Sequence, residues 1–176
     1  MSEGRSDDRI AAAFVAASRH QLVDDYLPKL RRAVSALPEG DLWWRPNDAS
    51  NSAGNLLLHL EGNLRQWVVA GVGGEPDTRR RQEEFETAEG PDAELLLDRL
   101  EVAIRDAARV LSDLTATRML EHVRIQERDV TVLEAVYHAV EHFGMHTGQI
   151  ILLAKLRAGR DLGFYRIEDG VPRRSW

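Results

Sequence analysis

Apolar residues recur at helical spacing in four long segments of the chain. In each segment they stand three and four positions apart, which gathers them on one face of a helix. The pattern predicts helices over residues 10–37, 52–70, 91–113 and 131–157. Strand signals are weak, and only Val123 and Ile125 favour a short strand-like piece. Four amphipathic helices predict an all-α fold, a four-helix bundle.

The ends of these helices carry recognisable signals. Thr131 with Glu134 three residues later predicts a capping box at the start of the fourth helix, and Gly159 predicts its end. Asn51 or Ser52 is suited to cap the second helix. Pro28 lies inside the first segment and predicts a kink or an interruption near residues 26–27.

The connection between the second and third helices, residues 71–90, is about twenty residues long and is therefore a crossover, not a tight turn. It is polar, with Phe85 as its one large apolar residue. Three arginines at 79–81 are followed closely by glutamates at 83, 84 and 86. Charges of both signs so close together predict a solvated, locally neutralised loop.

The last residues, 161–176, form a tail that carries Phe164, Tyr165 and Trp176. These aromatic side chains predict that the tail packs either back on the bundle or on a second subunit.

Composition narrows the class of protein. A chain of 176 residues with 43% hydrophobic residues suits one domain, residues 1–176, with a polar segment at 1–8 as a candidate disordered stretch. The net charge of −6 argues against a nucleic-acid partner. Without cysteine, any metal must be bound by nitrogen and oxygen. No apolar run predicts a membrane span or a secretion signal, so a cytoplasmic protein with no membrane partner is expected.

The candidate chemistry lies in the histidines. His138, His142 and His146 follow one another at intervals of four on the fourth predicted helix, and His59 lies on the second. Two imidazoles four residues apart can reach one divalent ion. The row turns by about 80° from first to last, so the pair is either 142/146 or 138/142, with His59 facing it. Ordinary hydrogen-bonded histidines are the alternative.

Three nitrogen ligands leave coordination positions open, where an ion would hold water and lower its pKa. Neutral imidazoles suit zinc, nickel, copper or iron. Asn55 and Asn63 stand one turn before and after His59, and Gln149 stands seven residues after His142. Each is a candidate to orient an imidazole or to bind substrate.

Further candidates lie near these segments. Arg45, beside Trp43 and Trp44, is a candidate for an acidic group of a substrate, while the two indoles are expected to cap the core. Glu61 and Glu141 point away from the nearest histidines and are expected to be solvated or in salt bridges. Glycines inside the predicted helices indicate either close packing near the site or tolerated small residues: Gly54, Gly62, Gly144 and Gly148.

Two blocks, residues 43–60 with His59 and residues 137–150 with the pattern H-x3-H-x-G-Q, resemble the DinB/YfiT-like superfamily of metal-binding four-helix bundles. The resemblance spans nearly the whole chain and implies a bundle with a long crossover connection. It implies that His59, His142 and His146 bind the metal, commonly zinc or nickel, and that His138 lines the pocket. It also implies a homodimer. Some relatives are transferases or isomerases that use low-molecular-weight thiols such as bacillithiol or mycothiol, and many have no assigned reaction.

These observations lead to a hypothesis of a metalloenzyme whose divalent ion activates water or a low-molecular-weight thiol for attack on a small-molecule substrate. Its reaction would be that of a thiol S-transferase or a hydrolase. The alternative is a non-catalytic metal-binding module in a stress response or an interaction. A bundle without metal is the third reading.

Overall fold

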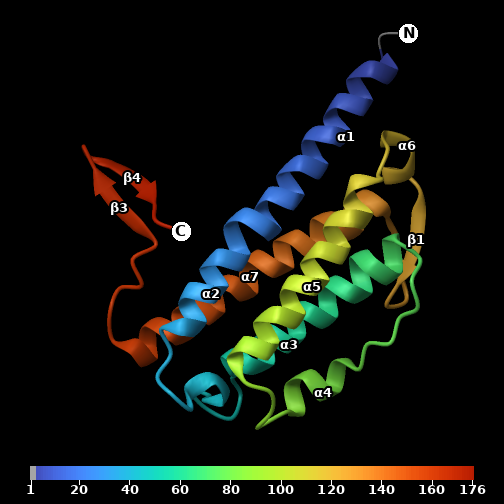
Figure 1. Ribbon diagram of the computed structural model, residues 1–176. Coiled ribbons are helices and arrows are strands. Elements are labelled where there is room, and N and C mark those ends of the chain that lie inside the picture. Colours follow the sequence, from blue (N-terminus) through green and yellow to red (C-terminus); the bar gives the residue numbers. More distant parts are fainter. Residues whose placement is uncertain (1–2) are drawn as a thin grey trace.

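The computed structural model describes residues 3–176 and shows a bundle of four helical arms (Figure 1). The arms, in chain order, are α1 (Glu3–His20) with the π-helical Gln21–Tyr26 and α2 (Leu27–Ser35); α3 (Ala53–Leu64) with the π-helical Arg65–Val72; α5 (Ala93–Ser112); and α7 (Val132–Ala158). The predicted all-α bundle with a long crossover is confirmed. Residues 3–8, a candidate disordered stretch in the sequence, belong to α1, and residues 1–2 lie outside the described residues.

The predicted helix ends are also present. Ser52 and Asn55 form a capping box at the start of α3, as Thr131 and Glu134 do at the start of α7. Gly159 ends α7 in a left-handed conformation, with φ of 62°. The interruption expected in the first arm is its π-helical segment, after which Pro28 sits in the first turn of α2, where its missing N–H costs nothing.

Shorter elements join the arms. Asp41–Trp43 is a 3-10 turn, α4 (Arg81–Glu86) lies in the crossover, and α6 (Ala116–Met119) follows α5. β1 (His122–Ile125) pairs antiparallel with β2 (Arg128–Thr131), so the predicted strand-like piece is half of a hairpin. Its buried Ile125 packs against Gly71 of the second arm. Within residues 3–176, no helix has the length and apolar composition that crossing a membrane requires.

The tail folds back on its own bundle, the first of its two predicted arrangements. Phe164 is buried, Trp176 packs edge-on against it, and the indole N–H of Trp176 donates to the carbonyl of Asp24 at 3.1 Å. Arg32 of α2 donates to the carbonyl of Ser175 at 2.6 Å. Between these contacts, β3 (Tyr165–Glu168) and β4 (Val171–Arg174) form a hairpin that extends away from the helices (Figure 1).

The predicted solvated loop is wrong for the centre of the crossover. α4 packs against α3 (Figure 1), and this contact buries Glu84 together with the side chain of Arg79. The surrounding Arg80, Glu83 and Glu86 are exposed, as expected. Alternating charges do predict solvation for an isolated loop, but here two opposite charges neutralise each other and enter the interior as a pair.

Three of the four helical glycines lie where another side chain approaches closely. A Cβ on Gly54 would lie 2.7 Å from the indole of Trp43, and one on Gly144 would lie 2.7 Å from the hydroxyl of Tyr26. A Cβ on Gly62 would lie 2.1 Å from Oε1 of Glu84. Nothing lies within 4 Å of the corresponding position at Gly148. The first three therefore fit the close-packing interpretation, and Gly148 fits the tolerated one.

Candidate metal centre

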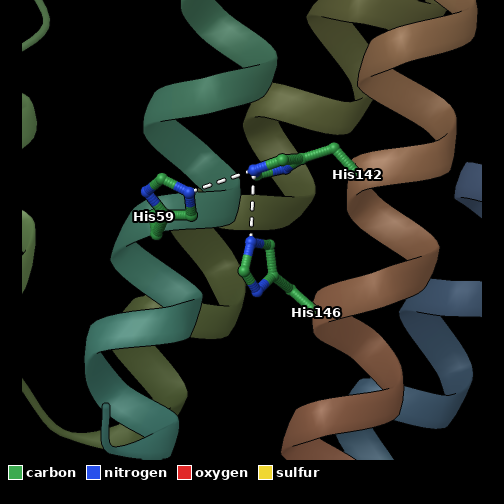
Figure 2. A group of neighbouring side chains, drawn as sticks. All are labelled: His59, His142 and His146. Carbon is green, nitrogen blue, oxygen red and sulfur yellow. Dashed lines mark hydrogen bonds between the residues drawn. The ribbon is translucent and has the colours of Figure 1, made fainter. Parts of the chain in front are cut away.

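Three imidazoles from two arms converge in the interior of the bundle (Figure 2). Nε2 of His142 lies 3.1 Å from Nε2 of His59 and 3.2 Å from Nε2 of His146. One ligand atom from each of the three lies within 4.8 Å of the others. Nitrogen ligands of a tetrahedral ion, at metal distances of about 2.0–2.1 Å, stand about 3.3 Å apart. The distances from His142 to the other two rings are close to this spacing, so the three rings together could hold a single ion.

The outer nitrogens of two rings reveal where their protons lie. His59 Nδ1 is 2.8 Å from Oε2 of Glu84, and His146 Nδ1 is 2.7 Å from Oε1 of Gln149. Burial raises the pKa of the Glu84 carboxyl, but hydrogen bonds from Arg79 and His59 outweigh burial and lower it overall. Glu84 is therefore a carboxylate that only accepts, so we assign a proton to Nδ1 of His59, which donates to it, and to Nδ1 of His146, which donates to Gln149. Nη2 of Arg79 also lies 3.0 Å from Nδ1 of His59. The Nε2 atoms of both rings are left with lone pairs.

Burial favours the neutral form of His142 and His146. Burial and, after it, the neighbouring charges of His146 and His59 together lower the pKa of His142 to about 3. Burial likewise lowers the pKa of His146, although its hydrogen bond to Gln149 opposes the change. Neutral imidazole is the form that coordinates metals.

The converging nitrogens form an incomplete hydrogen-bond network. A proton on Nε2 of His142 can be donated to Nε2 of His59 or of His146, but not fully to both. The lone pair of at least one Nε2 atom is therefore left without a donor. Nδ1 of His142 is buried and has no hydrogen-bond partner among the described residues. A divalent ion between the three Nε2 atoms would satisfy every lone pair at once, so the residues present fit such an ion.

The structure brings His142 and His146 to His59 and leaves His138 beside them, which decides between the two pairings that spacing left open. The ring of His138 lies 5.4 Å from that of His142 and 4.1 Å from that of Trp67. Burial lowers the pKa of His138 as well. His138 is thus a neighbour of the triad, packed on an indole.

The other candidates divide into those that touch an imidazole and those that hold the crossover. Gln149 contacts His146, as proposed from the sequence. Asn55 instead donates to the carbonyls of Glu84 at 2.9 Å and Thr87 at 2.7 Å. Arg45 donates to the carbonyls of Phe85 at 2.8 Å and Thr87 at 3.2 Å. Among the described residues, neither side chain forms a hydrogen bond with a histidine, because both bind backbone carbonyls of the crossover.

Two candidates are placed away from the imidazoles. Asn63 is buried on α3, and no hydrogen bond among the described residues joins it to a histidine. Glu61 forms salt bridges with Arg65 at 3.1 Å and Arg99 at 2.9 Å, as expected of a residue that points away from the site.

Sequence reasoning missed Glu84, Arg79 and Phe85. The ring of Phe85 lies 4.7 Å from that of His59, so it covers one side of the imidazole. Glu84 stands 25 residues from His59, and no periodicity relates the two segments. The one available signal was a single large apolar residue, Phe85, inside a charged stretch, since such a residue requires burial.

A cavity of about 1110 Å³ lies on the other side of the contact between His59 and Glu84. It is bounded by α3, the crossover and α5, and Gly62, Arg79 and Glu84 lie in its wall. The three histidines are not among its lining residues. The Arg79–Glu84 pair therefore stands between this cavity and His59.

Comparison with known proteins identifies the chain's relatives. A family model described as "Protein of unknown function (DUF1572)" matches residues 9–170. The chain belongs to this family. A conserved protein from Enterococcus faecalis has a similar solved structure, with a TM-score of 0.68 and 16% identity over 82% of this chain and 97% of that chain. No curated protein matches the chain significantly.

A second similar structure is that of the DinB-like protein YjoA from Bacillus subtilis, with a TM-score of 0.62 and 16% identity over 86% of this chain and 96% of that chain. The resemblance to DinB-like proteins found in the sequence is thereby confirmed. At this level of identity the two structures establish the fold.

Proposed function

We propose that this DinB-like protein binds one divalent ion through His59, His142 and His146 and uses it to activate water or a low-molecular-weight thiol. The observation that supports this most strongly is the convergence of three Nε2 atoms in the interior of the bundle. Zinc and nickel suit such a nitrogen donor set. When bound, the ion would supply a Lewis acid that lowers the pKa of a water or thiol at an open position.

The protein's own residues hold the ligands and limit access to them. Glu84 and Gln149 accept hydrogen bonds from Nδ1 of His59 and of His146, respectively, and so fix the orientation of the two rings. Phe85 lies against His59, and Trp67 lies against His138. These apolar rings exclude water from the sides of the cluster, which strengthens electrostatic interactions inside it. The reaction would be that of a thiol S-transferase or a hydrolase acting on a small molecule.

A second candidate function is a metal-binding module without catalysis. The closure of the site favours it, because His59 is 4% exposed and His146 is 9% exposed, while the large cavity lies behind Glu84. Cobalt-substituted protein distinguishes the two, since its visible spectrum reports new ligands. A thiolate-to-cobalt absorption band on addition of a small thiol supports the enzyme, and an unchanged spectrum supports the closed module.

Metal analysis of untagged protein tests the metal binding that both candidate functions assume. We expect wild-type protein to bind about one equivalent of zinc or nickel, and His142→Ala to lose most of it because only two ligands remain. His122→Ala is the matched control, since His122 is exposed on β1 and pairs with Asp129. Equal metal content in the two variants would overturn the assignment.

The homodimer also remains a proposal, and the outer face of α7 supports it. Tyr137, Met145, Leu152 and Leu156 are exposed there, between 48% and 62%. Leu133 and Leu156, and Tyr137 and Leu152, stand at equal distances on either side of the point between residues 144 and 145. In a two-fold contact between antiparallel copies of α7 centred there, Leu133 would meet Leu156 and Tyr137 would meet Leu152. Sedimentation velocity tests this, and a monomer at micromolar concentration would contradict it.

A further inference from the structure

The crossover places a buried ion pair directly behind His59. Arg79 donates from Nε to Oε1 of Glu84 at 2.7 Å and from Nη2 to Oε2 at 2.8 Å. Nη1 of Arg79 donates to Gln66 at 2.9 Å. Only 3% of the Arg79 side chain and 8% of Glu84 are exposed. The same Oε2 lies 2.8 Å from Nδ1 of His59, and Nη2 of Arg79 lies 3.0 Å from that nitrogen, so the pair and the imidazole form one network.

This arrangement requires two features that disfavour folding. A buried ion pair is often no more stable than an apolar pair of similar size, because both charges lose their hydration. A glycine within a helix also disfavours folding relative to alanine, and Gly62 leaves open the space that the end of the Glu84 side chain occupies, where a Cβ would meet Oε1. Features that locally disfavour folding occur together most often at functional sites, where their function maintains them. At this point in the fold the nearest candidate site is His59.

We propose that Glu84, held by Arg79, is a positioning residue of the metal centre. Its carboxylate keeps the proton of His59 on Nδ1 and so leaves the Nε2 lone pair directed at His142 and His146. Arg79 fixes the plane of the carboxylate through a two-point contact. The inference rests on the proposed metal binding and adds the crossover to the site, as a segment on which the affinity for metal depends.

The backbone of the crossover is fixed for this role. Asn55, one turn before His59, binds the carbonyl of Glu84 itself, and Arg45 binds the carbonyls of Phe85 and Thr87. These contacts hold α4 against α3 independently of the ion pair. A change at the Glu84 carboxylate can therefore be tested with the segment still in place.

The test compares Glu84→Gln with Glu83→Gln, its exposed neighbour that pairs with Arg80 on the surface. Zinc affinity is measured by competition with a chelator, and loss of such an outer contact weakens affinity about 10–100-fold. We expect that loss in Glu84→Gln, and an affinity equal to wild type in Glu83→Gln. Long-range proton–nitrogen NMR of the metal-free protein gives a second readout, in which His59 shifts from the Nδ1–H to the Nε2–H form in Glu84→Gln alone.

A second variant moves the pair without changing its charges. In Gly62→Ala the new methyl group displaces the ends of Glu84 and Arg79, which are flexible, so the fold is kept and the zinc affinity falls. Gly148→Ala, with open space around it, is the control and retains full affinity.

The outcomes separate the two proposals. If wild-type protein binds zinc and both Glu84→Gln and Gly62→Ala bind it equally well, with His59 unchanged in the NMR spectrum, the positioning role is refuted and the metal centre stands. If wild-type protein binds no zinc, the proposed function fails, and the positioning role fails with it.

Discussion

Acidification should destabilise the metal-free protein through His142. Burial, together with the neighbouring charges of His146 and His59, lowers the pKa of this imidazole from 6.5 to about 3 in the folded state, so the unfolded chain binds its proton more readily. Stability rises with pH wherever the unfolded state binds more protons. The contribution of His142 is therefore complete near neutral pH, decreases as the pH falls below 6.5, and is lost progressively down to about 3.

The size of this effect follows from the two pKa values. A pH of about 5 lies about 1.5 units below the pKa of an unfolded histidine, which is therefore protonated, whereas the folded His142 is still neutral. At about 1.4 kcal/mol per pH unit, this difference lowers the free energy of unfolding by about 2 kcal/mol. The ring is only partly buried, and solvent screening reduces this to about 1 kcal/mol. A loss of about 1–2 kcal/mol between about pH 7 and pH 5 is expected from this residue alone.

Urea unfolding in the presence of a chelator measures the effect in wild type and in His142→Gln, which has no titrating ring. The two proteins should differ in their pH dependence by about 1–2 kcal/mol, with wild type the more sensitive. His138 and His146, whose pKa values are also lowered by burial, remain in both proteins and so largely cancel. An identical pH dependence in the two proteins would refute the argument that His142 is held neutral by its surroundings.

Two further predictions concern the scaffold. Asn55→Ala removes half of a capping box and both hydrogen bonds to the crossover, so unfolding in urea should show a loss of at least about 1–2 kcal/mol; a change below about 0.5 kcal/mol would contradict this role. Gly148→Ala should raise the free energy of unfolding by up to about 1 kcal/mol through helix propensity, whereas Gly54→Ala should lower it because its Cβ would meet Trp43. Equal shifts in thermal midpoint for the two alanine variants would contradict this reading.

The sequence by itself determined the helical arms and their ends. Helical periodicity and capping depend on residues three or four positions apart, so the Thr131–Glu134 box and the last turn at Gly159 could be predicted from neighbours alone. The same is true of His142 and His146, which one turn of α7 brings together. His59 was expected opposite them from the two predicted helices, whereas spacing alone left the 138/142 pair as an alternative, and family resemblance selected 142/146.

Only the tertiary structure decided what surrounds the histidines. Glu84 reaches His59 across 25 residues because α4 packs on α3, and Gly62 leaves the space that its carboxylate occupies. Such a contact depends on how two segments distant in the sequence pack together. The hydrophobic pattern within either segment therefore does not predict it. For the same reason, the charged stretch at residues 79–86 looks solvated in the sequence, yet its central ion pair lies in the interior. The charge pattern shows that Arg79 and Glu84 can neutralise each other. Only packing determines that they do so behind His59, a proposed ligand of the metal.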